Sequence, residues 1–168
     1  MLELDYGTLL PNDDLSSLDF TERDGTDPLG VNEFARRKAI EYHKNKLATV
    51  RVIRFNKNIV AYFTVSMSAI SVENLDSKEK IMHATPIRYP AMLLGQLGVD
   101  KKYRGKGIGT DICNFCLGLA QEIGEKIACR YVILQTGIEK TSLYEKIGFV
   151  VSPKPLMGKK IWMYRRLA

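Results

Sequence analysis

The sequence contains no uninterrupted apolar run near the roughly 20 residues that a membrane-spanning helix requires. Its first residues, MLELDYGTLLPNDD, are acidic where a secretory signal would be basic. It also shows no internal repeat and no low-complexity tract. We therefore expect a cytoplasmic protein that has no membrane partner.

Cysteine is scarce, with three residues in a chain of 168. An odd number argues against a disulfide framework. Cys113 and Cys116 have the C-x-x-C spacing of some redox and metal sites, but there is no second Cys pair, and His43 and His83 are distant in sequence. We expect buried thiols here rather than a functional pair, and no metal site.

The remaining composition, 45% hydrophobic and 26% charged, is that of an ordinary globular chain. Its length favours a single domain over residues 1–168, which begins with an irregular acidic arm over residues 1–29. From Lys101 onward there are 13 Lys or Arg and 5 Asp or Glu, a local net charge of +8. The first 100 residues contain 12 Lys or Arg and 14 Asp or Glu, a net charge of −2. Such a basic half suits a phosphorylated cofactor, an acidic substrate or nucleic acid, and equally a solvated face.

Hydrophobic periodicity predicts an α/β (α+β) chain. We expect a short strand near Leu2, a helix over 31–46, and a hairpin formed by LATVRVIRF and IVAYFTVSMSAI around NKN. A polar connection over 71–90, with a short helix around DSKEKIM, leads to the strand YPAMLLGQLGV.

The second half of the chain alternates helices and strands. A helix is predicted from Gly109 to about Lys126. Its apolar stripe consists of Ile108, Ile112, Phe115, Leu119 and Ile123. The buried strand RYVILQT follows, then the helix EKTSLYEKI with Gly148 as its C-terminal cap, and then a hairpin formed by FVVS and IWMYRRL.

The segment LGQLGVDKKYRGKGIGT contains five glycines and four basic residues where the predicted strand gives way to a helix. A helix N-terminus presents unpaired amides and a partial positive charge, and glycines let those amides approach an anion closely. The glycines 105, 107 and 109, with Arg104 and Lys106, therefore favour a pyrophosphate site, although a simple tight turn is an alternative. The Walker and dinucleotide-binding patterns do not fit.

Arg104, Gly107 and Gly109 resemble the phosphate motif of the GNAT superfamily of acyl-CoA-dependent N-acetyltransferases, Q/R-x-x-G-x-G/A. LGQLGVDKKY resembles the family's splayed central strand, and SLYEKIGF its late helix followed by a Gly-Phe pair. The resemblance covers the element order from Val31 to Ala168. It implies a central mixed, largely antiparallel sheet, flanked by helices and splayed in a V between its two central strands.

The resemblance also implies that acetyl-CoA is a co-substrate. Its pyrophosphate would bind the loop, and its pantetheine arm would pair with the backbone of the preceding strand. The implied cofactor-binding residues are Leu97, Gly98, Val99, Arg104, Gly105, Lys106, Gly107, Ile108, Gly109 and Thr110.

Tyr144 is, by the same resemblance, the proton donor to the departing coenzyme A sulfur, and its alternative role is core packing. Several relatives place a Glu on the central strand as general base, but AMLLGQLGV contains no acid. Glu73, His83 and Glu41 are the candidates that remain. Gly137 stands where many relatives place an Asn that contacts the cofactor.

The amine acceptor stays open between a small molecule, a protein amine and aminoacyl-tRNA. PIRYPAMLLGQLGVD and IVAYFTVSMSAI resemble toxin-type GNAT enzymes that acetylate the α-amine of aminoacyl-tRNA, and the basic half suits tRNA. Without a strand acid, an α-amine near pKa 8 needs less help than a lysine near 10.4. A non-catalytic acyl-CoA- or RNA-binding module, a purely nucleic-acid-binding protein and a homodimer also stay open.

Overall fold

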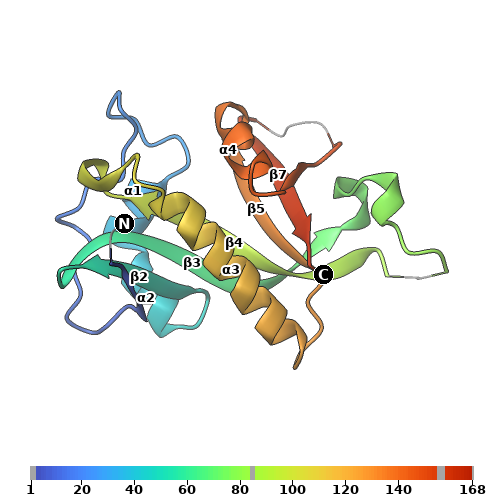
Figure 1. The fold of residues 1–168 in the computed structure, drawn as a ribbon, viewed down its shortest axis with the longest axis horizontal. Coiled ribbons are helices and arrows are strands. Elements are labelled where there is room, and N and C mark those ends of the chain that lie inside the picture. The colour runs from blue at the N-terminus through green and yellow to red at the C-terminus, as the bar shows by residue number, and fades with distance from the viewer. Residues whose placement is uncertain (1–2, 84–85, 155–157, 168) are drawn as a thin grey trace. The chain divides into compact units, whose positions relative to one another are not determined.

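The computed structural model describes residues 3–83, 86–154 and 158–167 (Figure 1). Two compact units make up the chain, unit 1 with Met1–Ser66 and Gly95–Ile112, and unit 2 with Met67–Leu94 and Cys113–Ala168. The expectation of one domain over 1–168 stays a prediction. Within the described residues, no helix has the length and apolar character needed to cross a membrane.

The described residues form a seven-stranded sheet of order β1-β2-β3-β4-β5-β7-β6. The strands are β1 Asp5–Thr8, β2 Thr49–Phe55, β3 Asn58–Ser71, β4 Arg88–Val99, β5 Tyr131–Gly137, β6 Val150–Val151 and β7 Lys160–Arg166. The pairs β1–β2, β2–β3, β5–β7 and β6–β7 are antiparallel, and β4–β5 is parallel. The predicted mixed, largely antiparallel sheet is confirmed.

The parallel pairing at the centre of the sheet is short. Ala91–Leu93 of β4 pair with Tyr131–Ile133 of β5, although β4 has 12 residues and β5 has seven. A parallel ladder limited to three residues agrees with the predicted splay.

Unit 1 is built on the predicted hairpin of β2 and β3. Asn56 and Lys57 form its turn with φ angles of 49° and 68°, the left-handed conformation that two-residue hairpin turns require. The arm before residue 30 contributes to the core of this unit, because Leu9, Leu15 and Phe20 are buried with Tyr62. The predicted strand near Leu2 lies outside the described residues, and the strand observed in the arm is β1.

The helix predicted over 31–46 is two helices, α1 Val31–Arg37 and α2 Ala39–Lys44. Lys38 separates them with a φ of −122°. Phe34, Ala35 and Ala39 are the buried residues of these two helices. No Pro or Gly near Lys38 predicts the break.

Helix α3 runs from Ile108 to Gly124, close to the predicted bounds. Its buried face differs from the predicted stripe, because Phe115, Leu119 and Ile123 are only partly buried. The buried residues are Ile108, Ile112, Cys113, Cys116, Leu117 and Ala120. Cys113 and Cys116 are free and buried, as the sequence predicted.

Unit 2 contains the connection from β3 to β4, which has two 3₁₀ turns, Val72–Asn74 and Ser77–Glu79, the second at the predicted short helix. Three tyrosine hydroxyls hold this connection. The Tyr164 hydroxyl accepts a hydrogen bond from the Asp76 amide, and the Tyr89 hydroxyl accepts one from the Ile81 amide, each at 3.0 Å. The Tyr131 hydroxyl donates a hydrogen bond to the buried Glu79 carboxylate at 3.1 Å.

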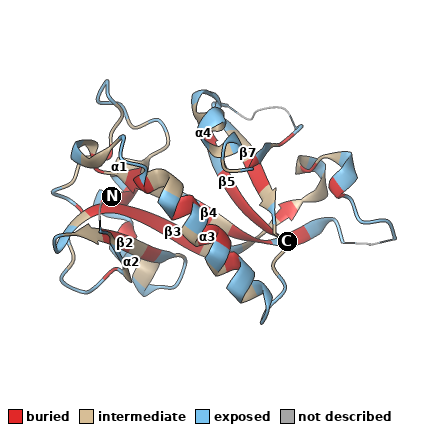
Figure 2. Cartoon of the chain, viewed as in Figure 1, coloured by how far each residue is buried: buried red, intermediate tan, exposed pale blue. Residues whose placement is uncertain are grey.

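The predicted helix EKTSLYEKI is a 3₁₀ turn over Ile138–Lys140 followed by α4, Thr141–Glu145. Strands β6 and β7 form the predicted C-terminal hairpin. β5, which precedes this turn, is buried along nearly its whole length (Figure 2).

Candidate active site

The glycine loop of unit 1 joins β4 to α3 through the 3₁₀ turn Lys101–Tyr103. Gly105 and Gly107 have φ angles of 75° and 83°, which L side chains rarely adopt. A Cβ at either position would have no neighbour within 4 Å, so open space adjoins the loop. The alternation of glycines thus serves backbone conformation and leaves the loop unobstructed.

Within the described part of the chain, the amides of this loop are available to a ligand. Among the described residues, no hydrogen bond is donated by the amides from Arg104 to Thr110, and that of Asp111 donates to the Gly107 carbonyl at 3.0 Å. These amides include the first ones of α3, where the helix dipole is positive. Exposed Lys106 adds a charge, so the predicted residues form an arrangement that can bind an anion.

Arg104 has a structural contact as well as a charge. Its Nε donates to the Val99 carbonyl at 3.0 Å, which braces the loop against the end of β4. This contact uses one of the carbonyls predicted to face the pantetheine arm.

Asp100 fixes the start of the loop and was missed by the sequence reasoning. It is buried, its Oδ1 accepts the Lys102 amide, and its Oδ2 accepts the Asp19 amide, both at 2.9 Å. An acid directly before a turn is a common capping signal, so the sequence contained a clue.

The predicted strand residues Leu97, Gly98 and Val99 lie at the end of β4. Gly98 is buried, and a Cβ there would come within 3.0 Å of Val31, Phe20 and Tyr62. Close packing inside unit 1 therefore requires this glycine, whatever its backbone binds.

Tyr144 lies on α4 in unit 2, whereas the glycine loop belongs to unit 1. The Phe149 amide donates to the Tyr144 carbonyl at 3.1 Å, and the Gly148 amide to the Glu145 carbonyl at 2.9 Å. With Gly148 at φ 90°, this is a Schellman motif, so the predicted cap is confirmed.

Burial raises the pKa of the Tyr144 phenol well above its usual range, and the thiol of Cys113 acts in the same direction. The Thr136 hydroxyl has the opposite effect and lowers that pKa. Burial also raises the pKa of Cys113 to about 12, so its thiol is neutral at physiological pH. The Tyr144 phenol is therefore protonated near neutral pH, the state from which a proton donor starts, and burial makes it a weaker acid.

Thr136, on β5, also escaped the sequence reasoning. Its Oγ1 is buried and makes no hydrogen bond of normal geometry to any residue that the structure describes. An unpartnered buried hydroxyl costs about 1–3 kcal/mol. A β-branched residue is common in strands, so the sequence gives no sign that this hydroxyl is buried without a partner.

The candidate bases lie on the surface. Glu73 pairs with Lys154 at 3.1 Å, and Glu41 and His83 are exposed. At Gly137 the Glu139 carboxylate occupies the space that a side chain would fill, and its Oε1 is the atom nearest to the position of a Cβ. The space left by glycine at residue 137, where many relatives place an Asn, is thus occupied by the carboxylate of Glu139.

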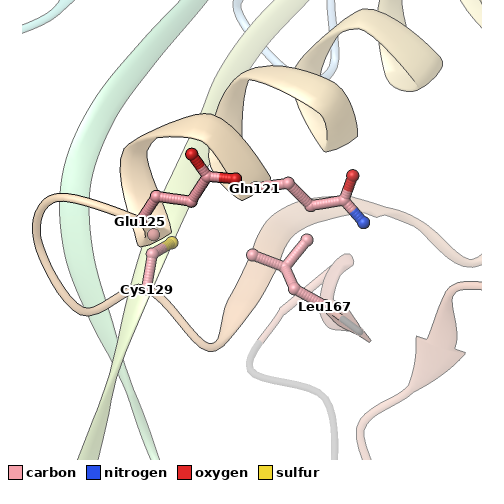
Figure 3. Close-up of a pocket in the computed structure, with 5 residues that line it drawn as sticks. Gln121, Glu125, Cys129 and Leu167 are labelled. Carbon is pink, nitrogen blue, oxygen red and sulfur yellow. The ribbon is translucent and has the colours of Figure 1, made fainter.

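A separate cavity of about 340 Å³ in unit 2 is lined by Gln121, Gly124, Glu125, Cys129 and Leu167 (Figure 3). The Cys129 thiol donates to the Tyr131 carbonyl at 3.6 Å. None of the residues predicted to bind or react lines this cavity.

The sequence profile of the acetyltransferase (GNAT) domain matches residues 46–151. A tRNA-acetylating toxin of Mycobacterium tuberculosis is 22% identical over 124 residues, which span 73% of this chain and 74% of the toxin.

Two solved structures are similar over nearly the whole chain. AtaT complexed with acetyl-methionyl-tRNAfMet has a TM-score of 0.81 at 17% identity, covering 98% of this chain and 95% of AtaT. AtaTR bound with acetyl-CoA has a TM-score of 0.75 at 19% identity, covering 97% and 93%. At such identities these likenesses establish the fold, and they confirm the one predicted.

Proposed function

The chain belongs to the GNAT family of acetyltransferases, and on this premise we propose that it transfers an acetyl group from acetyl-CoA to the α-amine of an aminoacyl-tRNA. The binding of acetyl-CoA is supported by one observation above all, which is that the amides from Arg104 to Thr110 donate to no described residue. The acceptor half is supported by the tRNA-acetylating relative and by the basic half of the chain.

The donor site suits a pyrophosphate. Two charged phosphates need several donors, and the loop offers amides that donate to no described residue, a helix N-terminus and the ammonium of Lys106. Gly109 lies in the first turn of α3, and the nearest atom to a Cβ there would be 4.0 Å away. A phosphate oxygen would fit where that Cβ is missing.

The reaction joins the amine nitrogen to the thioester carbonyl carbon and breaks the bond from that carbon to sulfur. The departing thiolate takes the phenol proton of Tyr144, the amine releases a proton to solvent, and solvent returns a proton to the Tyr144 phenolate. The products are the acetylated amine and free coenzyme A thiol. The proposal assigns phosphate binding to unit 1 and proton donation to unit 2.

An α-amine fits a site without a strong base. Near pKa 8 it is partly neutral at physiological pH, so a surface carboxylate or water suffices to take its proton. Exposed Lys126, Lys146 and Lys160 supply positive charge in unit 2, and Lys102 and Lys106 in unit 1. Such charges favour a polyanionic acceptor.

The test is transfer of radiolabelled acetyl groups from acetyl-CoA to four acceptors: charged tRNA, the same tRNA without its amino acid, a lysine peptide, and a free amino acid amide. We expect label on charged tRNA alone. Transfer should weaken steeply between 50 and 200 mM salt, since each phosphate contact releases counterions.

Label on the lysine peptide or the amino acid amide, with none on charged tRNA, would contradict aminoacyl-tRNA as the acceptor. It would leave acetyl-CoA as the acetyl donor. Failure of the protein to bind acetyl-CoA in calorimetry would contradict the donor site itself.

A further inference from the structure

The guanidinium of Arg165 on β7 contacts the chain just after helix α4. Successive side chains of a strand point to opposite faces, so Arg165 and its neighbour Arg166 diverge. Arg166 extends to the buried Glu79, with 3.4 Å between Nη1 and Oε2. On the other face, Arg165 donates from Nη1 to the Ile147 carbonyl at 2.5 Å, two residues after α4 ends. The alternation along β7 thus directs Arg165 toward α4.

The residue that Arg165 contacts belongs to the turn that anchors Tyr144. In this turn the Ile147 amide donates to the Tyr144 carbonyl at 3.0 Å, and the Phe149 amide donates to the same carbonyl at 3.1 Å. Ile147 therefore links the other two residues, because it accepts from Arg165 and donates to Tyr144. A cation at this place also complements the negative C-terminal end of a helix.

The side chain of Arg165 also packs along this turn. The three atoms nearest to a Cβ at Gly148 would be Nε, Cζ and Cδ of Arg165, at 3.4, 3.5 and 3.6 Å. Two kinds of contact, packing along the side chain and a hydrogen bond at its end, therefore join Arg165 to the turn. A methionine at this position would keep part of the packing and would lose the hydrogen bond.

Helix α4 depends on contacts of this kind because it has only five residues. A helix of that length is not stable by itself, so what it packs against sets its direction. Among the residues that the structure describes, the one at its N-cap supplies no side-chain hydrogen bond to the helix. The turn after α4, where Arg165 binds, is therefore a principal anchor for the direction of Tyr144.

We propose that Arg165 is a positioning residue for Tyr144, and that it holds the turn after α4 so that the phenol keeps the orientation from which it donates its proton. This inference rests on the proposed function. As the carbon–sulfur bond breaks, its electron pair stays on sulfur, the phenol proton moves to that sulfur, and solvent returns a proton to the phenolate. Arg165 takes no part in these bond changes.

The experiment compares Arg165→Met, Arg165→Lys, Tyr144→Phe and the double variant Arg165→Met with Tyr144→Phe. Thiol release from acetyl-CoA is measured with charged tRNA, together with KM for both substrates and the melting temperature. Arg165→Met should lower kcat by roughly 10-fold to 100-fold, as a small misplacement of a reacting group does. Arg165→Lys keeps a charged donor without the planar fork, so it should show the same pattern with a smaller loss.

The matched control is Arg166→Met, which removes a contact of the neighbouring arginine on the opposite face of β7. It should keep the parent kcat, although its melting temperature should fall by a few degrees, as should that of Arg165→Met. In all arginine variants KM for acetyl-CoA and for charged tRNA should stay at the parent values, because positioning acts on the chemical step.

Two further readouts separate positioning from a general loss of stability. In the Tyr144→Phe background, Arg165→Met should cause no further loss of kcat, because a residue that acts through the phenol has nothing left to act on. The carbon-13 resonance of Tyr144 Cζ should move in Arg165→Met and stay in place in Arg166→Met.

Unchanged kcat in both Arg165 variants beside a slow Tyr144→Phe would overturn this inference and leave the proposed function intact. Losses that multiply fully in the double variant, or equal losses of kcat in Arg165→Met and Arg166→Met, would also overturn it. A raised KM for charged tRNA with unchanged kcat would make Arg165 a contact of the acceptor instead. Unchanged kcat in Tyr144→Phe would sink the proposed acid, and this inference with it.

Discussion

The ring of Tyr144 meets the ring of Phe149 edge-on, with 6.0 Å between the centroids and an angle of 74° between the planes. The same two residues are joined through the backbone, because the Phe149 amide donates to the Tyr144 carbonyl. The ring is therefore held by contacts in which its hydroxyl takes no part. Packing and proton donation can be separated at this residue by removing one atom.

Tyr144→Phe removes that atom. We expect kcat to fall by roughly 10² to 10⁴, the usual contribution of a positioned acid, while the affinity for acetyl-CoA and the melting temperature change little. Steady-state kinetics, calorimetry and thermal unfolding of this variant make the check. A large fall in melting temperature with a proportionate loss of activity would assign Tyr144 to packing alone.

The raised pKa of Tyr144 predicts how stability depends on pH. In the unfolded chain this phenol loses its proton near pH 10, whereas burial keeps it protonated in the native state. Burial likewise raises the pKa of Tyr131 and Tyr164. The unfolded state therefore binds fewer protons above pH 10, and the free energy of unfolding should fall as pH rises beyond that value.

Urea unfolding between pH 7 and 11 measures this dependence. Up to about pH 10 these groups should not change the free energy of unfolding, and above that pH they should lower it. Tyr144→Phe should reduce the decline, since it removes one of the phenols. An equal decline in parent and variant would contradict the burial of this hydroxyl.

The element order and the glycine loop could be predicted because both have strong local signals. Hydrophobic periodicity indicated the strands and α3, and the left-handed conformations at Gly105 and Gly107 are ones that only glycine adopts readily. The buried face of α3 was predicted less well. Cys113, Cys116 and Ala120 are buried there, and small side chains of this kind contribute little to an apolar stripe.

Other features had no signal that a single sequence displays. The break at Lys38 is a backbone distortion within a run of good helix formers. Whether the buried Thr136 hydroxyl meets a partner among the described residues depends on which side chains surround β5, and spacing along the chain does not encode that. The connection from β3 to β4 was predicted only as a polar segment with a short helix, yet three tyrosine hydroxyls form hydrogen bonds to it.

The hydrogen bond between Tyr131 and Glu79 predicts an energetic coupling. Glu79 is buried, and its Oε2 also accepts from Arg166 Nη1 at 3.4 Å. Tyr131→Phe and Glu79→Gln should each lower the free energy of unfolding by about 1–3 kcal/mol, because each leaves a buried polar group with fewer partners. In the double variant the losses should fall short of additive by about 0.5–3 kcal/mol.

Urea unfolding of the four proteins measures that coupling. Asp76 and Tyr164 provide a neighbouring contact through the backbone amide, which neither substitution removes. Strict additivity would mean that the two groups do not interact in solution.

The last prediction concerns Gly109, where stability and binding should change in opposite directions. Gly109 lies within α3 at an ordinary helical conformation, and the nearest atom to an added Cβ would be Leu97 Cδ2 at 4.0 Å. Gly109→Ala should therefore leave the fold unstrained and should raise the free energy of unfolding by about 0.5–1 kcal/mol through helix propensity. If the loop binds pyrophosphate, the same methyl group points into the ligand's space, and we expect the Kd for acetyl-CoA to rise by at least about tenfold, a cost of about 1.4 kcal/mol.

Gly118→Ala is the matched control, because Gly118 is an exposed glycine of the same helix with nothing within 4 Å of its Cβ position. That control should gain similar stability and keep the parent Kd. Calorimetric titration with acetyl-CoA and thermal unfolding of both variants make the comparison, and a Gly109→Ala protein that binds acetyl-CoA as the parent does would show that the phosphates lie elsewhere.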